Sequence, residues 1–223
     1  QLNDTAAGMT DVTALDTGGF IVAYDNNQDI LARQFDNSGA PVGASFSVTG
    51  TVALQTQVDI DAFSGGGYLV AWVSDQESDP FGIYMQRFDA SNQMVTIDGG
   101  TLGANEVQVN TIETGSQGSP SVTTLSNGGF VVAWNNFVSG GDSQDGNAAS
   151  VSARLYDANG VAIQIPGAAD NGDFIVNDFT LGNQDSPEIT ALSNGRFIVT
   201  WNSAGSQDGS GIGVFAKIYG NDG

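Results

Sequence analysis

Apolar residues recur along the chain in four blocks of the same design. A nearly continuous apolar run lies at the centre of each block, at 19–24, 67–72, 129–134 and 195–201. A shorter alternating run precedes each of these segments, and a third apolar run follows it after a polar loop. Apolar runs bounded by Gly, Asn, Asp and Ser are typical of β-strands joined by tight turns. A repeat of this size cannot bury its apolar faces alone, so we expect the four copies to pack on one another.

The third copy shows the whole unit. An alternating strand at 121–125 leads through a turn to the apolar strand at 130–134, and strands at 151–157 and 174–177 follow. A strand without polar alternation is expected to be covered on both faces. The last copy lacks a fourth strand, whereas Leu2-Asn3-Asp4 at the start of the chain matches Val176-Asn177-Asp178 ahead of that copy.

These observations predict a single all-β domain. We expect a four-bladed β-propeller of four-stranded repeats that the N-terminal strand closes, because closure removes exposed sheet edges. The blades are expected near 9–49, 56–110, 119–177 and 186–223, with residues 1–5 as the closing strand. An open β-repeat array and a β-sandwich are the alternatives. The tryptophans Trp72, Trp134 and Trp201 end the central strands and are expected to pack in the core.

Composition narrows the chemistry. The 223 residues include 5 Lys and Arg against 25 Asp and Glu, a net charge of −20, which disfavours nucleic acid and anionic lipid as partners. No apolar run reaches the ~18 residues of a membrane helix, so membrane insertion is not expected. Without Cys or His the chain has no disulfide, no usual zinc ligand and no His-based triad. Enzymatic chemistry would therefore depend on carboxylates, and we do not expect an enzyme.

One loop pattern resembles a known family. The segment 197–201 is followed by Ser206-Gln207-Asp208-Gly209, and the segment 130–134 by Ser143-Gln144-Asp145-Gly146. This Gly-Gly-Phe-Val-Val-Ala-Trp and Gln-Asp-Gly unit resembles the repeat of large secreted bacterial proteins that are adhesin-like and often carry hemolysin-type (RTX) calcium-binding segments. The resemblance implies a secreted, cell-surface location. The first Met is absent, which favours a processed product or an excised domain.

The loops between second and third strands are the predicted sites. Carboxylates and turned backbone carbonyls are ligands that Ca²⁺ prefers, although no Asp-x-Asp-x-Asp-Gly spacing is present and Asp-Gly also simply makes a turn. The candidate Ca²⁺ ligands are Asp75, Glu77, Asp79, Asp142, Asp145 and Asp208. The longest loop, with Phe137, Asp142 and Asp145, is the predicted ligand contact, because these loops vary while the strands stay constant.

The sequence predicts a non-catalytic extracellular binding or adhesion module that recognises a glycan or a surface protein. Two alternatives stay open. One is a self-associating structural subunit of a surface layer, sheath or filament, formed by strand exchange at the N-terminus. The other is a carboxylate-based enzyme that cleaves polysaccharides, which needs one acid and one base or nucleophile.

Overall fold

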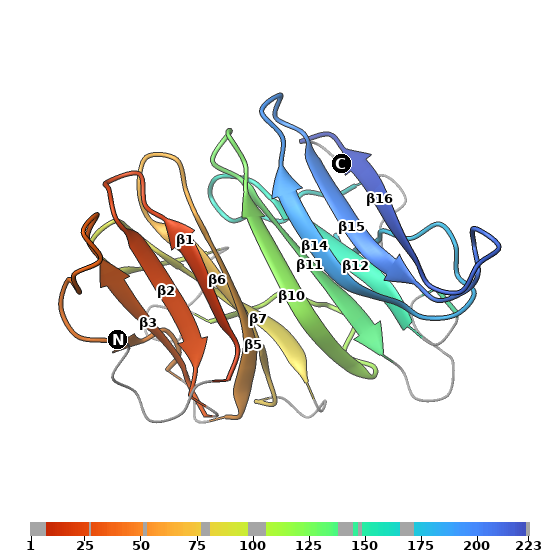
Figure 1. Ribbon diagram of the computed structural model, residues 1–223, viewed down its shortest axis with the longest axis horizontal. Helices are drawn as coiled ribbons and strands as arrows, with labels where there is room; N and C mark the ends of the chain where they lie inside the picture. The colour runs from red at the N-terminus through yellow and green to blue at the C-terminus, as the bar shows by residue number, and fades with distance from the viewer. Residues whose placement is uncertain are drawn as a thin grey trace.

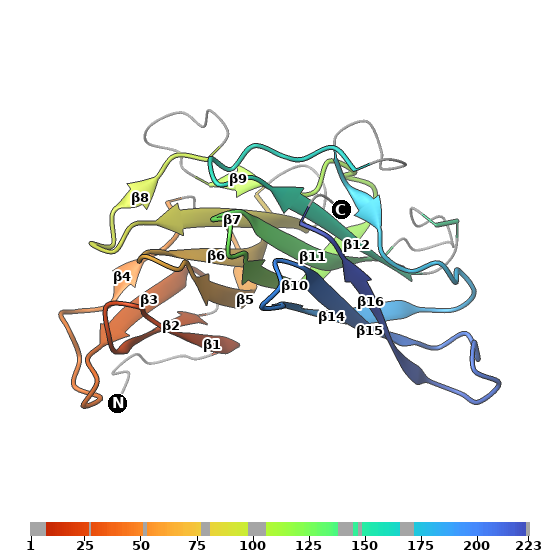
Figure 2. The same cartoon turned by 90° about the horizontal axis from the view of Figure 1, so that it is seen from above.

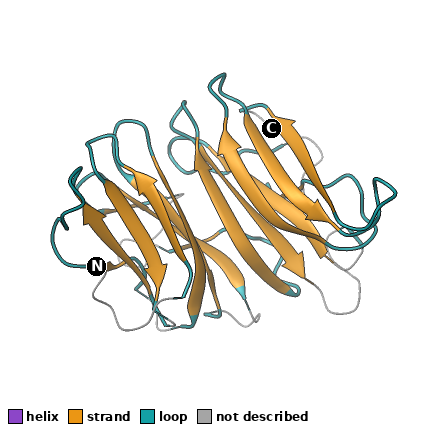
Figure 3. Cartoon of the chain, viewed as in Figure 1, coloured by secondary structure: helices purple, strands orange, loops and turns teal. Residues whose placement is uncertain are grey.

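The computed structural model describes residues 8–26, 28–50, 53–76, 81–97, 106–137, 145–146, 149–165 and 172–221. These residues form four antiparallel sheets, one after another along the chain (Figure 3). Within these ranges no helix is long and apolar enough to span a membrane. The predicted all-β architecture of four repeated sheets is confirmed.

Each sheet follows the chain from strand to neighbouring strand. The first contains β1 (Thr10–Ala14), β2 (Phe20–Asp25), β3 (Ile30–Phe35) and β4 (Phe46–Ser47). The second contains β5 (Gln55–Ala62), β6 (Tyr68–Ser74) and β7 (Gly82–Phe88), and both β8 (Met94–Val95) and β9 (Val107–Gln108) pair with β7. The third contains β10 (Ser116–Thr124), β11 (Phe130–Phe137), β12 (Ala149–Tyr156) and β13 (Phe174–Ile175). The fourth contains β14 (Gln184–Ala191), β15 (Phe197–Ser203) and β16 (Gly213–Tyr219).

The sheets stand in chain order around one axis, and the first strand of each sheet lies nearest to that axis (Figures 1 and 2). The predicted closing strand, residues 1–5, lies outside the described residues. Closure of the ring by that strand therefore stays a prediction.

Short turns set the hairpins of each sheet. In the third sheet the Leu125 N–H donates to the Gly129 carbonyl, and Gly128 adopts a left-handed φ of 85° that favours glycine. After the third strand, the Asp157 carboxylate accepts hydrogen bonds from the backbone N–H groups of Asn159 and Val161. Asp36 and Asp89 hold the equivalent turns in the same way. The Asp residues of these turns are therefore structural.

Three apolar cores lie between successive sheets. Ile21 and Ala23 of β2 pack with Tyr68 and Trp72 of β6, and Leu69 and Ala71 on the other face of β6 pack with Phe130 and Trp134 of β11. The same alternation joins β11 to β15, where Val131 and Ala133 pack with Phe197 and Trp201. Both faces of each central strand in the middle sheets are therefore buried, which explains their continuous apolar sequences. Trp72 and Trp134 are 0% exposed and Trp201 is 6% exposed, so the core role predicted for the tryptophans is confirmed.

The series of cores ends at the fourth sheet. Val214 and Ile218 of β16 occupy the positions at which Val151 and Leu155 of β12 face the next sheet, yet Val214 is 76% exposed and Val151 is 0% exposed. Among the described residues, no apolar cluster joins the fourth sheet to the first. The two end sheets thus each bury one face.

A matched pair of substitutions tests this asymmetry. Val151→Asp places a charge in a buried core and is expected to destabilise the fold by about 3–5 kcal/mol, whereas Val214→Asp is expected to change the free energy of unfolding by about 0.5 kcal/mol or less. Urea unfolding of both variants measures the difference. An equal loss in the two variants would mean that the fourth sheet packs against another surface in solution.

Candidate functional site

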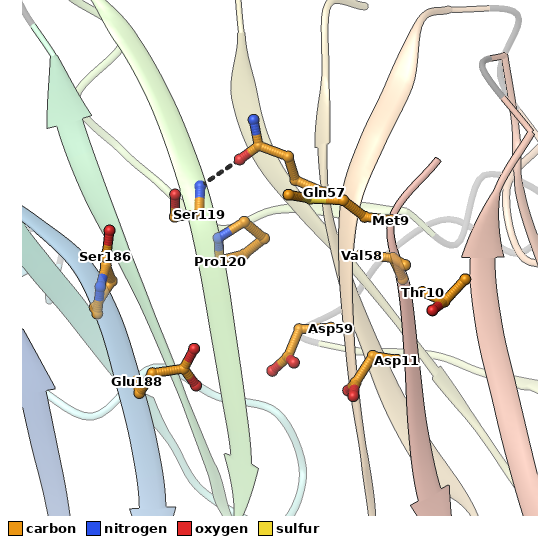
Figure 4. Close-up of a pocket in the computed structure, with 11 residues that line it drawn as sticks. Met9, Thr10, Asp11, Gln57, Val58, Asp59, Ser119, Pro120, Ser186 and Glu188 are labelled. Atoms are coloured by element: carbon orange, nitrogen blue, oxygen red, sulfur yellow. Dashed lines mark hydrogen bonds between the residues drawn. The ribbon is translucent and has the colours of Figure 1, made fainter. Parts of the chain in front are cut away.

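A pocket of about 450 Å³ opens on the axis of the molecule, where the first strands of all four sheets meet (Figure 4). It is named here the axial pocket. Each of β1, β5, β10 and β14 supplies two or three of its lining residues. The lining consists of Met9, Thr10, Asp11, Gln57, Val58, Asp59, Ser119, Pro120, Ser186, Pro187 and Glu188. The described residues thus converge on one cavity from four places far apart in the sequence.

One repeat position supplies the polar chemistry of this region. Asp11, Asp59, Ser121 and Glu188 pair across their sheets with Ala23, Ala71, Ala133 and Thr200, the residues directly before the aromatic side chain of each central strand. These four residues are named here the axial column. Three members of the axial column carry a carboxyl group, and three of the four line the pocket.

Members of the axial column connect each sheet to the next. The Asp11 carboxylate accepts a hydrogen bond from the Ile60 N–H at 2.9 Å, and the Asp59 carboxylate accepts one from the Val122 N–H at 2.6 Å. The Ser121 hydroxyl accepts from the Ile189 N–H at 3.2 Å. These bonds satisfy backbone donors on the inner edge of each sheet, which has no neighbouring strand there. The first three members therefore have a structural role.

Glu188 is the exception in the axial column. It is exposed, and among the described residues its carboxylate has no hydrogen bond or ion pair. Figure 4 shows this carboxylate pointing across the pocket toward Asp59. Glu188 is therefore the column's carboxylate that faces the cavity without a protein partner.

Backbone bulges shape the pocket wall. The pairing of the first strand with the second is interrupted just before the axial column in the second, third and fourth sheets. Gln57, Ser119 and Ser186 stand at these interruptions with φ angles of 54°, 48° and 54°, a left-handed conformation that is uncommon for residues other than glycine. All three line the pocket, and the Gln57 side chain accepts a hydrogen bond from the Ser119 N–H. Strained backbone of this kind concentrates at functional sites.

The pKa of the Asp59 carboxyl is raised to about 8. Burial is the main cause, since it removes water from the charged form, and hydrogen bonding with Asp11 together with the charges of Asp11 and Glu188 raises it further. The hydrogen bond from Val122 opposes this rise without cancelling it. Asp59 therefore holds its proton at neutral pH beside two other carboxyl groups.

The predicted loop sites lie apart from this pocket. Asp145 accepts a hydrogen bond from the Asn177 side chain, Asp75 accepts one from the Leu54 N–H, and Asp208 accepts one within its own turn from Ser210. Asp142, Glu77 and Asp79 lie outside the described residues. In the part of the chain that the structure describes, no group of three acidic, His or Cys side chains is arranged to hold a metal ion. The Ca²⁺ role of these loops stays a prediction.

Phe137 lies at the end of β11, with 43% of its surface exposed, and lines a second pocket of about 270 Å³ between the second and third sheets. Gln57 and Ser119 line both pockets, so the two cavities are neighbours. The structure thus places Phe137 beside a cavity, and its role in ligand contact stays a prediction.

The axial column is absent from the sites predicted from the sequence. Its members differ in type, and their strands read as ordinary alternating strands. The available signal was the recurrence of a Gln four residues before each of the last three members, at Gln55, Gln117 and Gln184. In each of these three sheets, the side chain four residues after the Gln is a hydrogen-bond acceptor and belongs to the axial column.

Comparisons with known proteins identify the architecture. No family model and no curated protein matches the chain. A thermostable family-43 glycoside hydrolase matches with a TM-score of 0.53 and 12% identity over 96% of this chain and 75% of that chain. An exo-1,5-α-L-arabinanase from a bovine ruminal metagenomic library matches with a TM-score of 0.52 and 9% identity over 95% and 74% of the two chains. The Dos1 propeller matches with a TM-score of 0.50 and 16% identity over 87% of this chain and 42% of that chain.

The fold is that of a small β-propeller. The propeller places the first strand of every sheet at the axis, which is why one repeat position forms a shared pocket. The resemblance to the secreted repeat family stays a prediction. The solved structures share only 9–16% of their residues with this chain, and such low identity shows the fold alone.

The raised pKa of Asp59 predicts a pH dependence of stability. Between pH 4 and pH 8 the unfolded chain releases this proton and the folded protein keeps it, so ionisation in the unfolded state lowers the free energy of unfolding by up to about 1.4 kcal/mol per pH unit. Asp59→Asn removes this dependence. The variant is expected to gain stability relative to the parent as the pH rises from 4 to 8, measured by urea unfolding across that range.

Asp157→Asn is a control in which the pH dependence of stability has the opposite sign, because turn hydrogen bonds lower the pKa of Asp157. That variant is expected to be less stable than the parent at pH 7, and the difference is expected to shrink as the pH falls below 4. A difference for Asp59→Asn that stays constant from pH 4 to pH 8 would contradict the raised pKa.

Proposed function

We propose that this protein is a non-catalytic extracellular module that binds a carbohydrate in the axial pocket. The observation that carries the proposal is the Glu188 carboxylate, which faces an open pocket with no hydrogen bond among the described residues and lies opposite the Asp11 and Asp59 pair. Carboxylate oxygens accept strong hydrogen bonds from hydroxyl groups, and a sugar ring supplies several hydroxyls in a fixed arrangement.

Pocket size and charge define the class of sugar. A volume of about 450 Å³ is within the range of small-molecule sites. The carboxyl groups in the lining and the net charge of −20 disfavour uronic acids and sulfated sugars, since these bring like charges together. Two of the structural neighbours are named as carbohydrate-active enzymes, a glycoside hydrolase and an arabinanase, and this supports carbohydrate as the ligand class. A secreted bacterial surface protein is the proposed setting.

Calorimetric titration with neutral and acidic oligosaccharides of equal length tests this proposal. Neutral oligosaccharides are expected to bind and uronic-acid oligomers are not. Glu188→Gln is expected to weaken binding at least about tenfold, because the amide nitrogen replaces one acceptor and an interaction with a charged group is lost. Asp36→Asn, in an exposed turn after β3, is the matched acidic control and is expected to bind as the parent does. Equal binding by Glu188→Gln and the parent would refute the axial site.

A second candidate is a carboxylate-based glycosidase, and the protonated state of Asp59 favours it. Hydrolysis of a glycosidic bond uses one carboxylic acid that donates a proton and one carboxylate that acts as base or nucleophile. Asp59, with a pKa of about 8, is protonated at neutral pH, and Glu188 lies on the opposite wall of the pocket. In this case Asp59 would be the acid and Glu188 the base or nucleophile.

Product analysis separates the two candidates. Incubation of the protein with neutral oligosaccharides at pH 5 to 9 is expected to release no reducing sugar if the protein is a binding module. Release of sugar by the parent, and its loss in both Asp59→Asn and Glu188→Gln, would establish the glycosidase instead.

A further inference from the structure

The second pocket, between the second and third sheets, holds a buried amide without a partner. Asn135 of β11 is 1% exposed, and neither its Oδ1 nor its Nδ2 forms a hydrogen bond among the described residues. Burial of an amide without hydrogen bonds is costly, so a group of this kind in a folded protein calls for a partner. Asn135 lines the pocket of about 270 Å³ that Phe137 also lines.

A glycine lies opposite this amide in the sheet and places no side chain over it. Gly118 pairs with Asn135 across the sheet, and a Cβ at Gly118 would lie 3.8 Å from Nδ2 and 4.0 Å from Oδ1 of Asn135. The same Cβ would lie 3.3 Å from Oε1 of Gln57, a residue that also lines the axial pocket. A side chain larger than glycine would therefore lie against the amide and cover it.

The remaining wall of the pocket is mainly apolar. Leu54, which precedes β5, Val73 of β6 and Phe81, which precedes β7, line this cavity together with Phe137. Leu54 and Phe137 are each 43% exposed, so the pocket is open to ligands from outside. A ligand for this cavity needs an apolar surface and, beside it, a donor and an acceptor for one amide.

We propose that this second pocket is a subsite for a 6-deoxyhexose residue of the glycan bound in the axial pocket. A fully hydroxylated hexose would leave its 6-hydroxyl unpaired against the apolar wall, whereas the methyl group of a 6-deoxyhexose fits there. Two neighbouring ring hydroxyls provide the donor and the acceptor that the Asn135 amide lacks. The C–H face of the ring packs on Phe137, and Gln57 and Ser119 join this subsite to the axial pocket.

The inference rests on the proposed carbohydrate-binding function, and its test uses sugars that differ only in the 6-hydroxyl group. L-fucose is compared with L-galactose, and L-rhamnose with L-mannose, by titration followed by NMR. At least one 6-deoxy sugar is expected to bind about tenfold more tightly than its partner, as is typical when one polar group is removed against an apolar wall. Chemical shifts of the Asn135 side-chain amide are expected to change on binding.

Three variants locate the preference. Asn135→Leu keeps the volume and removes the amide, and Gly118→Ala places a methyl group against the amide. Both are expected to abolish the preference for the 6-deoxy sugar, while the control Asp36→Asn, in the exposed turn after β3, is expected to keep it. Thermal melts establish that the variants fold.

The outcomes of these titrations distinguish the subsite from the axial site. Sugar binding without a 6-deoxy preference, or a preference that survives in Asn135→Leu, overturns the subsite and leaves the axial site standing. An Asn135 amide that exchanges only with water and shows no response to any sugar overturns the subsite as well. Failure of every sugar to bind overturns the subsite and the proposed function together.

Discussion

The structure depends on the packing of each sheet against the next, because no sheet can bury both of its apolar faces by itself. The central strands carry apolar side chains on both faces, and burial of such surface is the main favourable contribution to folding. Apolar packing alone does not fix how far one sheet slides along another. The hydrogen bonds from Ile60, Val122 and Ile189 to the axial column are directional, and they fix this offset between successive sheets.

Much of the fold could be predicted because short stretches of sequence determine the turns and strands of each sheet. The Ser126-Asn127-Gly128-Gly129 turn and the apolar run after it specify a hairpin without any knowledge of the neighbouring sheets. The core role predicted for the tryptophans is confirmed because these side chains continue the alternation of their strands. The pocket could not be predicted in this way. Its residues come from four sheets, and their common position is visible only after the bulges before Asp59, Ser121 and Glu188 are known.

The same geometry gives Asp59 two properties that oppose each other. Its carboxyl group accepts the Val122 N–H and so connects the second and third sheets, but the burial that this position requires disfavours the charged form. The neighbouring Asp11 is held beside it by its own bond to the second sheet, and the interaction between the two acids raises the pKa of Asp59 further. A shifted pKa at this position is therefore a consequence of the propeller geometry. It makes a proton available at the axis whether or not the protein uses it in catalysis.

Glu188 differs from the other members of the axial column, because its carboxylate has no hydrogen-bond donor among the described residues. In the first three sheets the member of the axial column accepts a hydrogen bond from the β-branched residue one place further along the next first strand. Val12 holds that place in the first sheet, but among the described residues the fourth sheet has no core against the first, and no bond from Val12 to Glu188 is present. The Glu188 carboxylate thus keeps the acceptor chemistry of the column without its usual donor. Among the described residues, the exposed face of β16 and the exposed carboxylate of Glu188 have one cause, the end of the packed series at the fourth sheet.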